Sequence, residues 1–126
     1  GLSGHVIIDD YAILEGKVAA QQFAHIGKHA FIGGASLIRK DVPPFIKAAR
    51  EPLTFAGVNS VGLRRRGYTD EQVREIEDIY RTIYVQNSNL SKGIDAVLQS
   101  MDKTPLRDEI LGFIQSSDKG VIRGMI

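Results

Sequence analysis

The feature that most constrains the fold is a six-residue period in the first third of the chain. When residues 2–43 are written in rows of six, the first column is entirely apolar and the fifth is entirely small or β-branched. The first column is Leu2, Ile8, Leu14, Ala20, Ile26, Ile32 and Ile38, and the fifth is Val6, Ala12, Val18, Ala24, Ala30, Ser36 and Val42. An α-helix cannot keep two such columns on one face, and a simple strand alternates with period two.

A solenoid with three short strands in each coil explains both columns. Each strand with its turn takes six residues, so about eighteen residues complete one coil. The first-column side chain points inward and stacks on its equivalent in the next coil, and the fifth-column residue lies near a corner. Five glycines fall at positions that fit turns, where a missing Cβ relieves a tight backbone: Gly4, Gly16, Gly27, Gly33 and Gly34.

The alternative for this segment is an antiparallel meander of short strands. It is disfavoured because residues 2–43 contain no Asn-Gly or Asp-Gly pair of the kind that closes tight hairpins. The period leaves the handedness of the coil open, and general chirality favours right-handed crossovers. Asp41-Val42-Pro43-Pro44 is expected to end the parallel stacking, because two prolines remove two ladder donors.

The remainder divides into a connector and a helical part. Residues 45–68 are predicted to be an extended connector that ends in the basic stretch Arg64-Arg65-Arg66-Gly67. Residues 69–126 are predicted to form a small helical domain. Thr69-Asp70-Glu71-Gln72 fits a capping box that opens a helix of about fifteen residues. Further helices are expected from Ser91, burying Ile94, Val97, Leu98 and Met101, and from Thr104-Pro105, burying Leu106, Ile110, Phe113 and Ile114. Residues 1–44 are thus assigned to β-helix coils, in a fold that is mainly β with α.

Composition limits the classes of function. The chain has no cysteine, no apolar run long enough for a membrane span and no basic-then-apolar leader, so a cytoplasmic location is the default expectation. Residues 51–68 carry three arginines and one acidic residue, which suits a phosphate-bearing partner better than a long nucleic acid. His25 and His29 are interpreted as ordinary surface residues, and neither a metal nor a cofactor is expected. The chain starts at Gly1 and enters the repeat at once, which predicts a piece of a longer protein.

Seven stretches give the chain a family resemblance. They are Leu2-Ser3-Gly4-His5-Val6, Gln22-Phe23, Ile32-Gly33-Gly34, Asp41-Val42-Pro43-Pro44, Gly57-Val58-Asn59, Gly62-Leu63-Arg64-Arg65-Arg66-Gly67-Tyr68 and Lys119-Gly120-Val121-Ile122-Arg123. In these stretches the chain resembles the UDP-N-acetylglucosamine O-acyltransferases, hexapeptide-repeat enzymes that begin lipid A synthesis in Gram-negative bacteria. The repeat is common to many acyltransferases, whereas the Pro-Pro exit followed by Gly-Leu-x-Arg-Arg-Gly-aromatic is specific.

The resemblance implies a fold, an assembly and a reaction. It implies a left-handed parallel β-helix in a homotrimer, with the active site between neighbouring subunits. The implied reaction moves a 3-hydroxyacyl group from acyl carrier protein to the 3-hydroxyl of UDP-N-acetylglucosamine. The family's general base is a histidine one coil upstream of His5, outside this sequence, so no catalytic residue is assigned to this chain and the chain alone is expected to be inactive.

The resemblance also implies substrate-binding roles for His5, Gln22, Asn59, Arg65 and Arg66. An arginine fork can hold a diphosphate through two hydrogen bonds, and an asparagine amide can pair with the edge of uracil.

Three further positions bear on the site. Gly34 matches a position that limits the acyl groove, so a long acyl chain is expected to fit. Two positions depart from the family pattern: Gln21 stands where relatives commonly carry histidine, and Val61 where many carry glutamate.

Two other functions remain open from the sequence. The first is the N-acyltransferase that acts later in the same pathway, which should lack the nucleotide segment around Arg65 and Arg66. The second is a non-catalytic module that only trimerises and docks acyl carrier protein. A histidine in the upstream coil would indicate the enzyme, and its absence would indicate the module.

Overall fold

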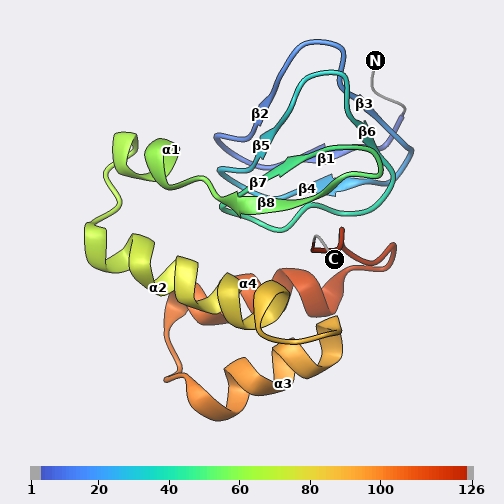
Figure 1. The fold of residues 1–126 in the computed structure, drawn as a ribbon. Helices are drawn as coiled ribbons and strands as arrows, with labels where there is room; N and C mark the ends of the chain where they lie inside the picture. Colours follow the sequence, from blue (N-terminus) through green and yellow to red (C-terminus); the bar gives the residue numbers. More distant parts are fainter. Residues whose placement is uncertain (1–3, 125–126) are drawn as a thin grey trace.

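Three stacks of short parallel strands form the first part of the molecule in the computed structural model, which describes residues 4–124 (Figure 1). The six strands are β1 (Ile7–Ile8), β2 (Ile13–Leu14), β3 (Ala19–Ala20), β4 (His25–Ile26), β5 (Phe31–Ile32) and β6 (Leu37–Ile38). β1 pairs with β4, β2 with β5 and β3 with β6, all in parallel and all between residues eighteen apart. The predicted three-sided parallel coil is confirmed, and an antiparallel meander is excluded for these strands.

The inward columns form the core of the coils. Ile26, Ile32 and Ile38 have no exposed surface, and neither do Ala24 and Ala30 of the fifth column. Since a coil interior removes these side chains from water on every side, each contributes about 0.8 kcal/mol per buried methylene.

The first coil is less well covered. The expectation of full burial is wrong for Ile8, which is 41% exposed, because β1 has a paired strand on one side only. Leu2 and Ser3, which began the predicted repeat, lie outside the described residues.

The corners of the coils take a left-handed backbone conformation at non-glycine residues. The fourth-column residues His5, Tyr11, Lys17, Phe23, His29 and Ala35 all have φ between 58° and 69°. The sequence analysis expected a missing Cβ to relieve the tight backbone at the turn glycines, which is wrong for Gly4 and Gly16, since a Cβ at either would meet nothing within 4 Å. Gly27 does need to be glycine, because a Cβ there would lie 2.5 Å from the backbone nitrogen of Pro44.

The parallel stacking continues past the two prolines, contrary to the sequence expectation. β7 (Ile46–Ala49) pairs in parallel with β5, with Phe31 opposite Lys47 and Ile32 opposite Ala48. Pro43 and Pro44 lie between the bridge residue Val42 and β7, where no strand pairing needs the missing N–H groups. The proline pair therefore forms a turn of the solenoid and does not end it.

The predicted extended connector is a hairpin followed by a short helix. β8 (Thr54–Val58) runs antiparallel to β7, with an irregularity between Ile46 and Ala48, and completes a four-stranded sheet in the order β2-β5-β7-β8. α1 (Ser60–Arg65) follows at once and buries Leu63. The prediction of an extended connector missed both elements, because β8 is held by pairing to β7 and not by a local pattern.

The helical part agrees with the predicted caps. α2 (Asp70–Tyr80) opens with the capping box of Thr69 and Gln72 and continues as a π-helix over Arg81–Val85. α3 spans Leu90–Ser100, and α4 spans Pro105–Ser116 with Thr104 as its N-cap. One core expectation is wrong: Leu98 is 44% exposed. No helix within residues 4–124 is both long enough and apolar enough to span a bilayer.

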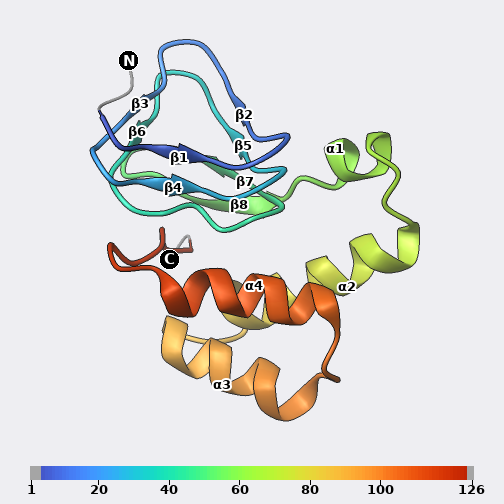
Figure 2. The same ribbon diagram turned by 180° about the vertical axis from the view of Figure 1, so that it is seen from behind.

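The helices cover one end of the coils. In Figures 1 and 2, α2 and α4 lie next to the strands, and α3 lies on the side of these two helices that faces away from the strands. The buried Tyr80 hydroxyl donates to the Pro44 carbonyl at 2.6 Å, and the Tyr84 hydroxyl donates to the Ile122 carbonyl at 2.7 Å. The chain after α4 returns to the coils through the bridges Asp41–Val121 and Thr54–Arg123. These contacts fix the helical part against the solenoid.

Replacing Gly27 by alanine tests the close approach of the two coils. The added methyl group would overlap the Pro44 backbone, so the free energy of unfolding should fall by about 1–3 kcal/mol. Gly112→Ala in the middle of α4 is the matched control, because a Cβ there meets nothing within 4 Å and alanine favours helix by about 0.5–1 kcal/mol. Urea denaturation measures both, and an unchanged midpoint for Gly27→Ala would contradict the packing described.

Candidate functional site

The basic segment predicted to bind phosphate lies beside one corner of the coils. Arg65 and Arg66, at the end of α1, line a surface pocket of about 680 Å³. The other lining residues are Asp10, Tyr11, Lys28, His29, Gly67 and Tyr68. Arg64 differs from its neighbours, because it pairs with Asp70 at 2.9 Å and does not line the pocket. Two of the three arginines thus supply positive charge to the pocket, which we call the basic pocket.

An aromatic column forms the wall of the basic pocket. The rings of Tyr11 and His29 stack with centroids 5.0 Å apart, and those of His29 and Phe45 lie 6.1 Å apart. Tyr68 meets His29 edge-on at 5.2 Å, and the Arg66 guanidinium carbon lies 4.4 Å from the Tyr11 ring centre. His29 is only 6% exposed, so its interpretation as a surface residue was wrong. Tyr11 and His29 are eighteen residues apart, and this spacing in the fourth column was the sequence signal for their contact.

Burial and the cations of the basic pocket disfavour the protonated form of His29. Burial lowers the pKa of His29, and the cations Lys28 and Arg66 lower it further, against weaker opposite effects of Glu109 and Asp10. An uncharged ring remains a good stacking partner for Tyr11. The pocket therefore holds positive charge on Lys28, Arg65 and Arg66 and not on the imidazole.

Asn59 connects α1 to the aromatic corner. Its Oδ1 accepts a hydrogen bond from the Gly62 backbone at 3.3 Å, and its Nδ2 donates to the His29 carbonyl at 3.0 Å. Both ends of the amide are therefore engaged within the chain. This geometry gives Asn59 a clear role in placing the helix that carries Arg65 and Arg66.

The other predicted site residues lie at different corners. The His5 ring stacks on the Phe23 ring, with centroids 5.4 Å apart. Gln22, which precedes Phe23, is exposed, and its backbone carbonyl accepts a hydrogen bond from Lys119 Nζ at 3.2 Å. Gly34 is exposed at the turn between β5 and β6, and its N–H donates to Glu15 at 3.1 Å. The corners of His5, of Tyr11 and of Lys17 are successive corners of one coil. Within one chain, the structure does not bring His5, Arg66 and Gly34 together.

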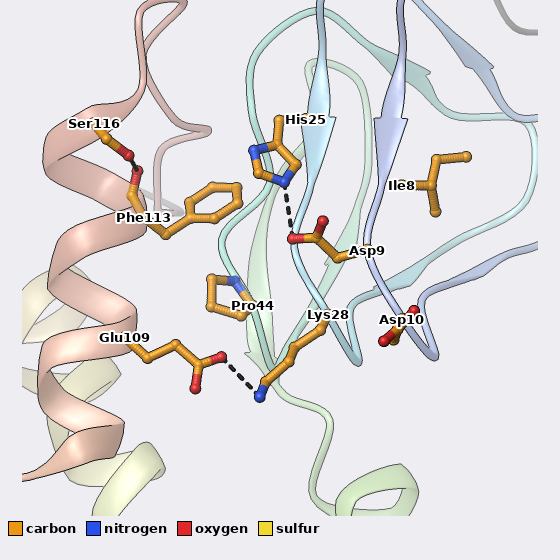
Figure 3. A pocket seen from close by; sticks show the side chains of 9 residues that line it. All are labelled: Ile8, Asp9, Asp10, His25, Lys28, Pro44, Glu109, Phe113 and Ser116. Carbon is orange, nitrogen blue, oxygen red and sulfur yellow. Dashed lines mark hydrogen bonds and ion pairs between the residues drawn. The ribbon is translucent and has the colours of Figure 1, made fainter.

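A second pocket, of about 500 Å³, lies between the coils and α4 (Figure 3). Lys28 and Glu109 form an ion pair across it at 2.9 Å, and His25 Nε2 lies 2.8 Å from Asp9 Oδ2. The Phe113 ring packs against His25 at 4.6 Å. His25 thus connects the coils with α4, through Asp9 and Phe113, and is not an ordinary surface residue. Lys28 and Asp10 line both pockets.

No group of three or more potential metal ligands is present among residues 4–124.

Comparison with known proteins identifies the class. A family model described as UDP N-acetylglucosamine O-acyltransferase, domain 2, matches residues 41–122. The chain is 37% identical over 126 residues to the acyl-[acyl-carrier-protein]–UDP-N-acetylglucosamine O-acyltransferase of Herminiimonas arsenicoxydans, covering 97% of the chain and 48% of that protein. A chain of stacked parallel strands with a helical end thus matches a class of acyltransferases.

Solved structures agree. The UDP-N-acetylglucosamine acyltransferase of Bacteroides fragilis superposes with a TM-score of 0.88 at 39% identity, over 94% of this chain and 46% of that one. The enzyme of Francisella novicida superposes with a TM-score of 0.89 at 36% identity, over 98% of this chain and 45% of that one. The chain belongs to the UDP-N-acetylglucosamine O-acyltransferase family, and it spans about half the length of the relatives that it matches.

The lowered pKa of His29 predicts a pH-dependent stability. Below about pH 6.5 the unfolded state takes up a proton that the folded state resists, so the free energy of unfolding should fall as the pH drops. His29→Phe keeps a stacking ring and removes the titration. Its melting temperature should therefore fall less than that of the wild type between about pH 7.5 and about pH 5.5. An equal fall of the melting temperature in the two proteins across this range would contradict the lowered pKa of His29.

Proposed function

We propose that this chain is part of an enzyme that transfers a 3-hydroxyacyl group from acyl carrier protein to the 3-hydroxyl of UDP-N-acetylglucosamine, the first step of lipid A biosynthesis. The observation that carries the proposal is the pairing of Arg65 and Arg66 in one pocket with aromatic rings. Neither Arg65 nor Arg66 forms an ion pair within residues 4–124. Two adjacent guanidinium groups suit a diphosphate, which lysine or a neutral side chain binds less specifically. The names of the matched relatives agree with this substrate.

The reaction is an acyl transfer. The sugar hydroxyl oxygen attacks the thioester carbonyl, the carbon–sulfur bond breaks, and the carrier thiol leaves with a proton. A general base must take the hydroxyl proton, and an imidazole suits that role near neutral pH. We place that base in an upstream coil outside this chain, in line with the family resemblance. The residues of this chain then bind and orient the substrates.

We further propose a left-handed coil, a homotrimer and a cytoplasmic location. The trimer is supported by the distribution of the predicted site residues, since His5 lies at one corner of a coil and Arg66 contacts Tyr11 at the next corner. Packing of a second copy against the face between two corners would place His5 of one subunit near the basic pocket of the next. Gln22, which lies next to Phe23, would reach the same site with His5.

Substitution of Arg66 in the complete enzyme tests the nucleotide site. A charge-assisted hydrogen bond contributes about 1.5–3 kcal/mol, so Arg66→Ala should raise the KM for UDP-N-acetylglucosamine about 10- to 100-fold. Arg64→Ala is the matched control, because Arg64 pairs with Asp70 outside the basic pocket. Equal effects of the two substitutions, or no effect of Arg66→Ala, would sink the proposal.

Substitution of Gly34 tests the acyl groove. A Cβ at Gly34 would lie 3.3 Å from the Gly16 carbonyl, so a larger side chain must extend outward from the coils. If the acyl chain runs along this surface, Gly34→Met should shift the preference toward shorter acyl chains. Competition between carrier-bound acyl chains of different length measures this shift. Gly112→Met, in open space on α4, is the control, and an unchanged preference for Gly34→Met would remove Gly34 from the groove.

A further inference from the structure

The contact between Arg66 and Tyr11 is not explained by the fold. Arg66 caps the end of α1, and its guanidinium carbon lies 4.4 Å from the centre of the Tyr11 ring. The ion pairs found within residues 4–124 include Arg64 but neither Arg65 nor Arg66. The ring face is therefore the contact that restrains the Arg66 cation.

A ring face restrains an arginine without using up its donors. A carboxylate partner would accept the N–H groups and neutralise the charge, as Asp70 does for Arg64. The face of an aromatic ring attracts the cation through its quadrupole and leaves the N–H groups in the guanidinium plane available. Arg66 is thus held in one place while it keeps both its charge and its hydrogen-bonding capacity.

Tyr11 is itself held firmly at an exposed position. Its ring stacks on the buried His29, which stacks in turn on the fully buried Phe45. Tyr11 remains 56% exposed, so it contributes little to the core. The buried rings of His29 and Phe45 thus hold the exposed Tyr11 ring in place.

The corner geometry does not require an aromatic residue at this place. Lys17 occupies the next corner of the same coil with φ of 63°, compared with 61° for Tyr11, and Ala35 takes the same conformation one coil on. Residues of quite different type therefore meet the backbone requirement. The tyrosine is explained by what it contacts, which is Arg66 and the basic pocket.

We propose that Tyr11 is a positioning residue that holds the Arg66 guanidinium ready to bind an anionic group of the substrate, such as a nucleoside diphosphate. This inference rests on the proposed function, and it adds a residue that acts through Arg66. Pre-orientation lowers the entropy lost when the arginine side chain is fixed by the ligand. The effect should therefore appear in substrate binding and not in the chemical step.

The test uses ring-removing and ring-keeping variants of the complete enzyme. Tyr11→Asn removes the ring, and asparagine tolerates the left-handed conformation of this corner. It should raise the KM for UDP-N-acetylglucosamine, and the dissociation constant of UDP alone, about 2- to 5-fold with kcat unchanged. Tyr11→Leu, a second ring-less variant, should behave alike, and Tyr11→Phe should restore wild-type binding. Lys17→Asn, the same change at the next corner, should have no effect.

A double-mutant cycle with Arg66→Ala separates this inference from the proposed function. If Tyr11 acts through Arg66, then Tyr11→Asn should change nothing further in the Arg66→Ala background. If Arg66→Ala weakens UDP binding and Tyr11→Asn adds its own full effect to it, the positioning role is overturned while the nucleotide site stands. If Arg66→Ala leaves UDP binding unchanged, the nucleotide site fails and the role of Tyr11 fails with it.

Discussion

Parallel pairing between residues eighteen apart is the constraint on which the rest of the structure depends. It places each inward side chain directly over its equivalent, so that Ile26, Ile32 and Ile38 form a continuous interior. The same register aligns the corners. Rings at fourth-column positions therefore stack on one another outside the coil, as in His5 on Phe23 and Tyr11 on His29. The core and the surface columns are two results of one repeat.

The basic pocket depends on one of these corners. Asn59 anchors α1 through the His29 carbonyl, and Tyr68 packs edge-on against the His29 ring. The helix end that carries Arg65 and Arg66 is thus fixed by contacts with the coil, although the helix itself has only six residues. Burial disfavours the protonated form of His29, so the positive charge of the pocket lies on Lys28, Arg65 and Arg66.

The helical part and the coils are joined through the segment after the two prolines. The Pro44 backbone packs against Gly27, and its carbonyl accepts a hydrogen bond from the Tyr80 hydroxyl. Pro44 therefore links the coil to α2. Lys28 extends this link to α4 through Glu109. Because Lys28 also lines the basic pocket, α4 and the pocket share a cation, and the placement of the helical domain bears directly on the charge of the site.

The sequence by itself determined what is encoded locally or by a regular period. The six-residue repeat, the capping box of Thr69 and Gln72, the start of α4 at Pro105 and the basic segment were all predictable, because neighbours in sequence or one coil apart decide them. Only the tertiary structure decided that β7 continues the stack beyond Pro44, that β8 pairs with β7 and that His29 is buried. It also placed His5, the contact of Arg66 with Tyr11, and Gly34 at different corners of the coils. These outcomes depend on contacts between distant segments, whose energies no local pattern records.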